Sequence, residues 1–387
     1  MSAQPEPNWA WLGLLKWSLT HVDGTVPSEE SPNFKQMSEE DKKFLEEVMK
    51  NGIIDEGERM KIILRHLVTF LDAIKASDET PASSSTSTKD VQEKLAMPPV
   101  EIDIQKNLST KEIEQLLQEL QDIVEQIDFA KSFMTLGGIP FLLGCASQTK
   151  AVPQSIRARC LAVLGTLNQN NPAVQYKMLE EGNIPKLINI FFAEFLQTNP
   201  CTEIQARALQ AMSCSIRNHD MAEKIFCMNQ EGRKMIEAAL GLYSHILEET
   251  EDSSKQPLPT PSDAMRRKAL FFFQALITSD SADSDRIALF ANAIQYAATR
   301  FLDSSKEDNS DIRETTLSML TRILDQKKYV NAILDAKTYL VDLGIKRISE
   351  LRKFEGEEKE MIVEELRLWE LLISQLARVV RDEVQVS

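Results

Sequence analysis

Apolar residues recur at intervals of three and four along most of this chain, which is the spacing of one face of a helix. In residues 8 to 20 the stripe consists of Trp9, Leu12, Leu15 and Leu19. Asp23 and Gly24 follow it and end the pattern. We expect a short amphipathic helix there, within an N-terminal segment that covers residues 1 to 36.

Residues 37 to 76 contain two longer helical patterns. A cap at Ser38, followed by acidic residues, opens the first pattern, and an Asn-Gly pair closes it. The second pattern starts at Asp55. Its apolar side consists of Met60, Ile63, Leu64, Leu67, Val68 and Leu71. Two adjacent helices joined by a tight turn predict an αα-hairpin.

Two stretches of the chain lack the large apolar residues that a core needs. From 77 to 88, eight of twelve residues are Ser or Thr, so we expect a flexible linker over residues 77 to 100. Residues 248 to 262 begin with an acidic run and continue with three prolines, which predicts a solvent-exposed insertion.

Between and after these breaks the chain repeats itself. Aligning similar apolar helices places Cys160, Ala208, Ala269 and Thr316 at one position, with spacings of 48, 61 and 47 residues. The longest spacing contains the acidic insertion. A turn and a short helix follow the first of these helices, and then Gly182 opens another helix. Three helices per repeat is the armadillo pattern.

The sequence therefore predicts an all-α armadillo-repeat solenoid of about four repeats over residues 101 to 350. Each helix triplet has an apolar face that it cannot cover alone, so neighbouring repeats bury it and the stack curves around a groove. Ser109 and Glu112 have the spacing of a capping box, so residues 109 to 126 would cap the N-terminal end. A strongly charged helix in residues 351 to 387 would cap the C-terminal end.

Charge and hydropathy narrow the range of partners and compartments. The chain has 44 Lys and Arg against 59 Asp and Glu, and the net charge of −15 disfavours nucleic acid and anionic membranes. No apolar stretch reaches the roughly 20 residues of a membrane span. The apolar run that begins at Trp9 follows Glu6 rather than a basic residue, unlike a signal peptide. We expect a cytosolic, monomeric protein.

Residues with the chemistry of a catalytic or metal site are sparse. The five cysteines form no C-x-x-C pair and fall within apolar helical patterns, so we interpret them as reduced core thiols. We interpret the even spacing of Cys201, Cys214 and Cys227 as coincidence, with the three thiols on separate helices. The four histidines lack metal-ligand spacing, and the common phosphate, metal and nucleophile motifs are absent. We expect no catalytic residue, no metal, no cofactor and no enzymatic activity.

Several short strings point to one family. They are LLKWSLTH at residues 14 to 21, MSEE and ERMK at residues 37 to 40 and 58 to 61, GTLNQNNP at residues 165 to 172, and IRNH at residues 216 to 219. In this order they resemble the Fes-type nucleotide exchange factors, armadillo proteins related to the heat-shock-protein-binding protein of animals. That family acts on DnaK-type (heat shock protein 70) chaperones. The resemblance covers about residues 8 to 325, and the linker and the acidic insertion are longer than the family pattern requires.

The resemblance implies a function by binding alone. In the family, the concave armadillo face grips one lobe of the chaperone's ATPase domain and forces the other lobe aside, so that ADP leaves. We therefore expect a nucleotide exchange factor whose partner is a cytosolic heat shock protein 70.

The resemblance also implies contact residues. Ala130 matches a small residue at the chaperone contact, where a bulky side chain would hold the partner off, and Lys268 matches a basic contact position. A helix-packing alanine and a solvated lysine remain alternatives. Four further candidates lie at the ends of groove-lining helices, where chaperone contact and turn capping are equally open. They are Asn168, Asn171, Arg217 and Asn218.

The N-terminal stripe matches the family's release segment, which competes with client peptides for the chaperone's peptide-binding domain. The residues concerned here are Leu14, Leu15, Lys16, Trp17 and Leu19. Three of the four tryptophans lie in this segment, and an apolar stretch of this size marks a binding site. Docking onto the protein's own armadillo body is the alternative.

Two other functions compete with nucleotide exchange. A generic armadillo adaptor would grip an extended peptide, as importin-type proteins do, and a scaffold would hold ubiquitin or kinase partners. Peptide-gripping adaptors typically carry a groove ladder of Trp and Asn, whereas Trp369 is the only tryptophan outside the N-terminal segment. This difference favours the exchange factor.

Overall fold

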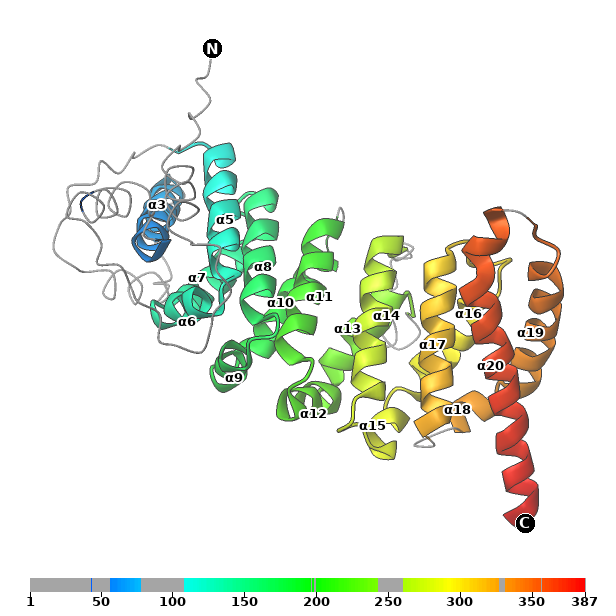
Figure 1. The fold of residues 1–387 in the computed structure, drawn as a ribbon. Coiled ribbons are helices and arrows are strands. Elements are labelled where there is room, and N and C mark those ends of the chain that lie inside the picture. Colours follow the sequence, from blue (N-terminus) through cyan, green and yellow to red (C-terminus); the bar gives the residue numbers. More distant parts are fainter. Residues whose placement is uncertain are drawn as a thin grey trace, which may run out of the picture. The chain divides into compact units, whose positions relative to one another are not determined.

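The computed structural model describes residues 43, 56–77, 108–195, 197, 200–242, 260–326, 331–355 and 357–386. Within these residues the regular secondary structure is helical throughout (Figure 1). The chain divides into two compact units, Met1–Ile62 and Ile63–Ser387. Nearly all of the described residues belong to the second unit.

The described helices after residue 126 form successive triplets, each with a short first helix and a longer third one. The first triplet is α6 (Ile127–Thr135), α7 (Gly138–Ser147) and α8 (Gln154–Asn168). The second is α9 (Pro172–Glu180), α10 (Asn183–Phe195) and α11 (Thr202–Ile216). The third is α12 (Asp220–Met228), α13 (Gln230–Leu240) and α14 (Asp263–Thr278). The fourth is α15 (Ser284–Ala288), α16 (Ala291–Arg300) and α17 (Ser310–Gln326). A last set follows with α18 (Asn331–Leu334), α19 (Lys337–Leu351) and α20 (Glu357–Val386).

The repeat register predicted from the sequence is confirmed by burial. The aligned residues Cys160, Ala208, Ala269 and Thr316 lie on the third helices α8, α11, α14 and α17, and each is at most 1% exposed. The third helices also pack in order, α8 on α11, α11 on α14, and α14 on α17 (Figure 1). A small residue at this position lets successive third helices approach, so the predicted all-α armadillo solenoid is confirmed.

Local signals explain where the array begins. Helix α5 (Thr110–Val124) packs against α8 and has the predicted capping box. The Ser109 backbone N–H donates to Glu112 Oε2 at 2.7 Å, and the Glu112 backbone N–H donates to Ser109 Oγ at 3.4 Å. Two N–H groups that no helical carbonyl can accept are thereby paired.

The Gly137-Gly138 pair at the start of α7 is required for two different reasons. Gly137 has φ +84°, a left-handed conformation that L side chains rarely adopt. A Cβ added to Gly138 would lie 2.0 Å from Cε1 of the buried Phe133, so α6 and α7 meet only because no side chain intervenes. Both glycines set the tight turn from α6 into α7.

At the C-terminal end, the predicted capping helix takes the place of a third helix. Helix α20 packs against α17 and α19, and its inner face buries Leu368, Trp369, Leu372 and Leu376. A Cβ on Gly344 of α19 would lie 2.8 Å from Cε3 of Trp369, so the glycine admits the indole ring. The triplet arrangement therefore continues to α20, and the capping role of this helix stays a prediction.

An arginine recurs three residues before the aligned position in three third helices, and each is paired with a buried glutamate; Arg157 and Arg313 are buried, and Arg266 is half-buried. Arg157 lies 2.6 Å from Glu194, Arg266 pairs with Glu307, and Arg313 lies 3.0 Å from Glu365. Breaking one such pair leaves an uncompensated charge in the core. These pairs specify how each third helix sits against the elements beside it.

The predicted hairpin is described only in its second helix. Helix α3 (Glu56–Ser77) begins where expected, and all six residues of its predicted apolar side are at most 8% exposed. The first helix of the hairpin, apart from Lys43, lies outside the described residues, as do residues 1 to 36, residues 78 to 100 and most of the insertion. Ser262, the last residue of the predicted insertion, is the N-cap of α14.

The structure corrects the interpretation of one cysteine. Cys145, Cys160, Cys214 and Cys227 are buried free thiols, as expected. Cys201 is half-buried and occupies the N-cap of α11, so it is not part of an apolar helical pattern. It therefore lies on no helix of its own, whereas Cys214 is on α11 and Cys227 is on α12.

No single described helix is long and apolar enough to cross a membrane. Helices α6 and α7 pass that test of length and composition only when taken together, and they are bent by 76° at their junction.

Candidate functional site

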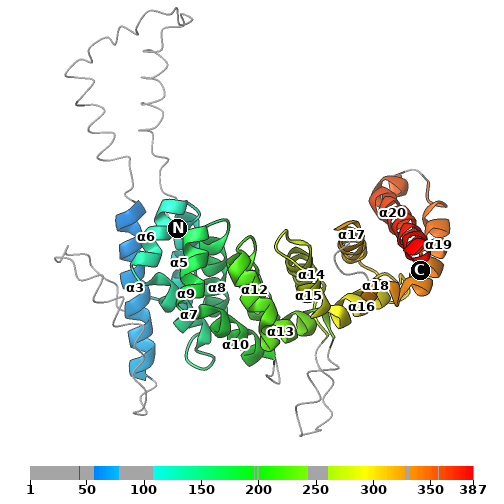
Figure 2. The same ribbon diagram turned by 90° about the horizontal axis from the view of Figure 1, so that it is seen from below.

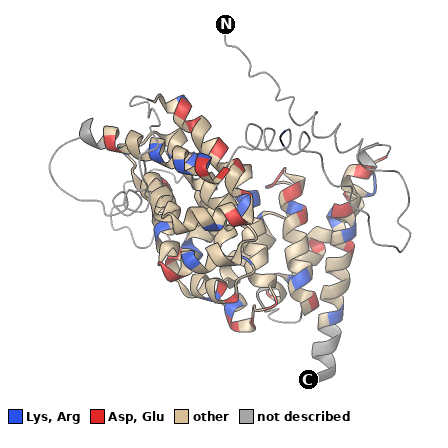
Figure 3. Ribbon diagram, turned by 60° about the vertical axis from the view of Figure 1, so that its left-hand side comes forward, with Lys and Arg blue, Asp and Glu red and all other residues tan. Residues whose placement is uncertain are grey.

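The clearest candidate surface lies on the third helices α8, α11 and α14. The residue before each aligned small residue is Arg159, Arg207 and Lys268, and in α17 it is Thr315. Because successive third helices pack side by side, these residues form a row of three cations across three repeats. Lys and Arg are otherwise intermixed with Asp and Glu over the helices (Figure 3). A row of one sign is therefore a local feature in a chain of net charge −15.

Two of the three cations donate hydrogen bonds to neutral amides of the helix that packs beside their own. Arg159 Nη1 donates to Gln118 Oε1 of α5 at 2.6 Å, and Lys268 Nζ donates to Gln210 Oε1 of α11 at 2.9 Å. Arg207 has a carboxylate nearby, but the Nε to Glu203 Oε1 distance is 3.9 Å. An amide orients a cation without cancelling its charge, so the row is positioned to bind carboxylates of a partner.

Lys268 is the most constrained of the three. Burial lowers the pKa of its ammonium group, and the positive charge of Arg207 lowers that pKa further. Both causes destabilise the charged form of Lys268 relative to its neutral form in the free protein. A carboxylate brought to Lys268 by a partner would relieve that cost, so this lysine favours binding to an acidic surface.

An exposed aromatic residue lies beside the cations. Phe271 of α14 is 54% exposed, and the guanidinium carbon of Arg217 lies 4.6 Å from the centre of its ring. This cation–π contact contributes about 0.5–1 kcal/mol at an exposed site and fixes both side chains. Phe271 is not among the contact residues predicted from the sequence. The available signal is its position three residues after Lys268, on the same side of the helix.

We call the outward-facing set of these residues the third-helix face. It consists of Arg159, Arg207, Gln210, Arg217, Lys268 and Phe271. Cations, an amide and an exposed ring suit the recognition of a folded protein surface.

The turn asparagines are divided between core and surface. Asn168 is fully buried, and its Nδ2 donates to the Leu164 carbonyl at 2.8 Å. Asn171 is 2% exposed and occupies the N-cap of α9, but its side chain makes no capping hydrogen bond. Asn218 is exposed and has φ +63°, so it forms the turn after α11. Of the predicted turn candidates, Arg217 and Asn218 are at least partly exposed, whereas the side chains of Asn168 and Asn171 lie inside.

Ala130 is 1% exposed within α6, where it belongs to the packed core. An arginine introduced there would have to enter that core, so it is expected to disturb folding rather than leave the fold intact. The role of Ala130 in partner binding stays a prediction. The release-segment candidates, from Leu14 to Leu19, lie outside the described residues.

The described residues contain no group of three or more His, Cys, Asp or Glu side chains placed to hold a metal ion. The thiols of Cys214 and Cys227 are also poor nucleophiles, because burial raises the pKa of Cys214 and raises that of Cys227 to about 12. What the geometry offers is a binding surface.

The similar solved structures include an engineered protein and a designed armadillo repeat protein. An engineered protein matches with a TM-score of 0.47 at 13% identity, covering 76% of this chain and 98% of that one. A designed armadillo repeat protein in complex with the peptide (KR)4 matches with a TM-score of 0.43 at 15% identity, covering 76% of this chain and 100% of that one.

Sequence relatives are more specific. The Hsp70-binding protein 1 of Mus musculus is 29% identical over 222 residues, which are 57% of this chain and 52% of that protein. The human protein of the same name is 28% identical over 211 residues, or 54% of this chain and 48% of that protein. The Hsp70 nucleotide exchange factor FES1 of Coccidioides immitis is 27% identical over 138 residues, 34% of this chain and 61% of that protein.

The chain thus spans about half the length of the Hsp70-binding proteins that it matches. Residues 129–238 match the family model of the SIL1/FES1/HPBP1 C-terminal domain, which includes α7 to α13. The predicted resemblance is therefore confirmed, and the chain is similar through this armadillo segment to the SIL1/FES1/HPBP1 family.

Proposed function

We propose that this protein is a nucleotide exchange factor of a cytosolic heat shock protein 70, and that the third-helix face binds the chaperone's ATPase domain. The observation that carries the proposal is the row of Arg159, Arg207 and Lys268 in a segment similar to Hsp70-binding proteins. Two cations held by neutral amides, and a third with a single exposed ion pair at 3.9 Å, suit an acidic patch on a folded partner.

Exchange by binding alone requires a preference between two states of the partner. A protein that binds the open, nucleotide-free ATPase domain better than the closed one shifts the equilibrium toward release of ADP. Each tenfold acceleration needs about 1.4 kcal/mol of differential binding, so a thousandfold effect needs roughly 4 kcal/mol. A face that extends over three repeats supplies enough contacts for this, and no catalytic group is needed.

A peptide-gripping armadillo adaptor is less well supported. Such an adaptor needs exposed groove residues, above all tryptophans, to sandwich an extended chain. The one tryptophan in the described part of the chain, Trp369, is fully buried between α19 and α20. The third helices carry a row of cations instead, which favours a folded acidic surface as the ligand.

The test is a stopped-flow measurement of fluorescent ADP release from a cytosolic heat shock protein 70, with and without the full-length protein. We expect release to accelerate by roughly 100-fold or more at saturation, which corresponds to about 2.7 kcal/mol. The purified protein alone should hydrolyse no ATP. An unchanged release rate at saturating concentration would show that the proposal is wrong.

A further inference from the structure

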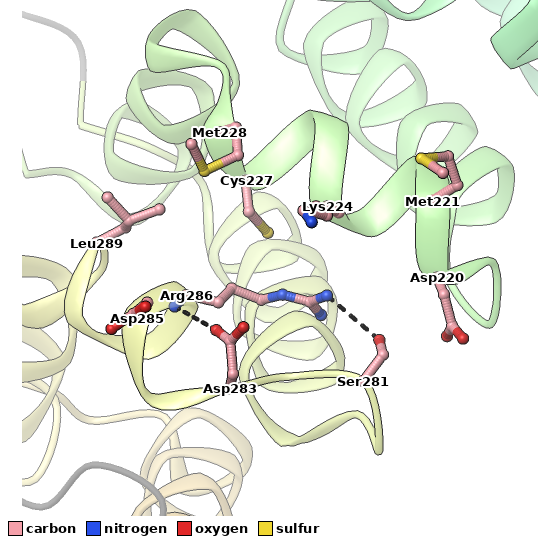
Figure 4. Close-up of a pocket in the computed structure, with 10 residues that line it drawn as sticks. All are labelled: Asp220, Met221, Lys224, Cys227, Met228, Ser281, Asp283, Asp285, Arg286 and Leu289. Carbon is pink, nitrogen blue, oxygen red and sulfur yellow. Dashed lines mark hydrogen bonds between the residues drawn. The ribbon is translucent and has the colours of Figure 1, made fainter.

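A pocket of about 540 Å³ lies between α12 and α15, the first helices of two successive triplets (Figure 4). We call it the α12–α15 groove. It is lined by Asp220, Met221, Lys224, Cys227, Met228, Ser281, Asp283, Asp285, Arg286 and Leu289. Its volume lies within the range of about 300–1,000 Å³ that ligand sites occupy.

Exposed apolar side chains line the α12–α15 groove and continue beside it. Met221, Ile225 and Met228 are spaced at i, i+4 and i+7 along α12, so they form one stripe, and they are 57%, 44% and 66% exposed. Leu289 adds a fourth apolar group from the end of α15, at 39% exposure. The opposite side of α12 buries Ala222 and Phe226, so the core does not use this stripe. An apolar stripe left facing solvent marks an interaction site.

The floor of the groove is rigid and electrically balanced. Arg286 Nη1 lies 2.9 Å from Glu223 Oε2, and both side chains are buried. The hydroxyls of Ser279 and Ser281 donate to the same carboxylate at 2.8 and 3.0 Å. Asp283 accepts the backbone N–H of Arg286 at 2.7 Å. This network holds α12 and α15 apart at a fixed separation, so the groove exists before any ligand arrives.

The rim of the groove is acidic. Asp220, Asp283 and Asp285 are exposed around it, against the single exposed cation Lys224. A ligand with positive charge beside its apolar groups would therefore complement the groove. Burial raises the pKa of the Cys227 thiol to about 12, which argues against a metal or redox role for this lining.

We propose that the α12–α15 groove binds a short segment of a partner protein in which leucine-like anchors alternate with Lys or Arg. Flexible methionine side chains adapt to such anchors, and the three aspartates select the basic residues. This second surface is built from first helices and is separate from the third-helix face. It gives the protein a means to hold another protein while the third-helix face is occupied.

Three ten-residue peptides labelled with fluorescein test the inference. One contains Leu and Lys, the second replaces each Lys by Glu, and the third replaces each Leu by Ser. We expect the full-length protein to bind the first peptide at least tenfold more tightly than either of the others. Equal binding of the Leu/Lys and Leu/Glu peptides would overturn the proposal, because the acidic rim would then have no role.

The site of binding is read from methionine methyl groups labelled with 13C. The resonances of Met221 and Met228 should shift and saturate with the Leu/Lys peptide, whereas that of Met361, 79% exposed on α20, should not move. The double variant Met221→Ser, Met228→Ser should weaken peptide binding at least tenfold, and Met361→Ser should have no effect. Shifts confined to other methionines would overturn the assignment.

The same double variant separates this inference from the proposed exchange function. It should accelerate ADP release from heat shock protein 70 within twofold of the wild type. If it lost exchange activity while keeping its thermal stability, the groove would be part of the chaperone contact and the second surface would not exist. If the wild-type protein failed to bind the Leu/Lys peptide while it still accelerated ADP release, the groove proposal alone would be wrong.

Discussion

At the residue scale, the fold holds the charge of Lys268 in one position and in a partly buried environment. Its ammonium group is partly desolvated, Arg207 repels it, and Gln210 orients it without neutralising it. Phe271, one turn further along α14, adds an exposed ring that Arg217 holds in place. Such a pair of aromatic and cation is the kind of group that dominates protein interfaces.

Lys268→Ala should weaken binding of the chaperone's ATPase domain about tenfold, and Phe271→Ser should do the same, because each removes one anchor worth about 1–2 kcal/mol. Isothermal titration calorimetry measures both effects. Lys346→Ala, which removes an exposed lysine from α19, is the matched control and should leave the affinity unchanged. Wild-type affinity in both variants would show that the third-helix face points away from the chaperone.

At the element scale, α20 depends on one carboxylate. Glu365 is 1% exposed and accepts hydrogen bonds from Arg313 of α17 and Arg347 of α19, at distances between 2.8 and 3.2 Å. Burial by itself raises the pKa of Glu365, but the hydrogen bonds and charges of Arg347 and Arg313 outweigh it, so the pKa lies below its ordinary value. The three helices are thereby joined at a single point.

Glu365→Gln should leave the buried guanidinium of Arg313 without its counter-charge and remove one of the two carboxylates that pair with Arg347, at a cost of roughly 3 kcal/mol. Measured by hydrogen exchange, α20 should open about 100-fold more often, which is the same free energy. Glu364→Gln is the control, because that side chain is exposed and pairs only with the exposed Arg367. An unchanged exchange rate in α20 would show that apolar packing alone holds this helix.

The pH dependence follows from the direction of the shift. Because the pKa of Glu365 is lowered in the folded protein, its contribution is complete above the unfolded-state pKa of about 4.3 and is lost as pH falls through the folded-state value. The difference in α20 exchange between the wild type and Glu365→Gln should therefore narrow below about pH 4. Glu364→Gln should show no such convergence of comparable size, since its pair is solvent-exposed.

At the scale of the whole molecule, we propose separate tasks for the armadillo array and the N-terminal segment. The array has its own core, built from buried residues of α5 to α20. Residues 1 to 36 lie outside the described part of the chain, and their sequence has an apolar stripe too short for a stable isolated helix in water. We therefore propose that the array promotes ADP release and that the segment promotes client release.

Deleting residues 1 to 36 should leave ADP release within about twofold of normal but slow the displacement of a labelled client peptide from the chaperone. The double variant Leu15→Ala, Trp17→Ala should reproduce most of that loss, because it removes two anchors of the stripe. Trp369 serves no such role, since it is buried in the array. A truncated protein that melts several degrees lower and fails in both assays would place the segment in the folded core instead.

The sequence by itself determined the helices and their register. Periodicity, caps and small residues are local signals, so the aligned position of Cys160 and Ala208, the capping box at Ser109 and the start of α3 near Asp55 could all be derived from spacing. The short motifs also sufficed to identify the family resemblance. Each of these features is encoded within a few turns of chain.

Only the tertiary structure decided which side chains face solvent and which elements meet. Ala130 and Asn171 became core residues, and α20 became a third helix, because neighbouring elements cover them. The Arg217–Phe271 contact and the α12–α15 groove likewise join residues 53 or more positions apart in sequence. The helical period of the sequence predicts an apolar face and a polar face for each helix. The packing of successive repeats determines which elements cover each face.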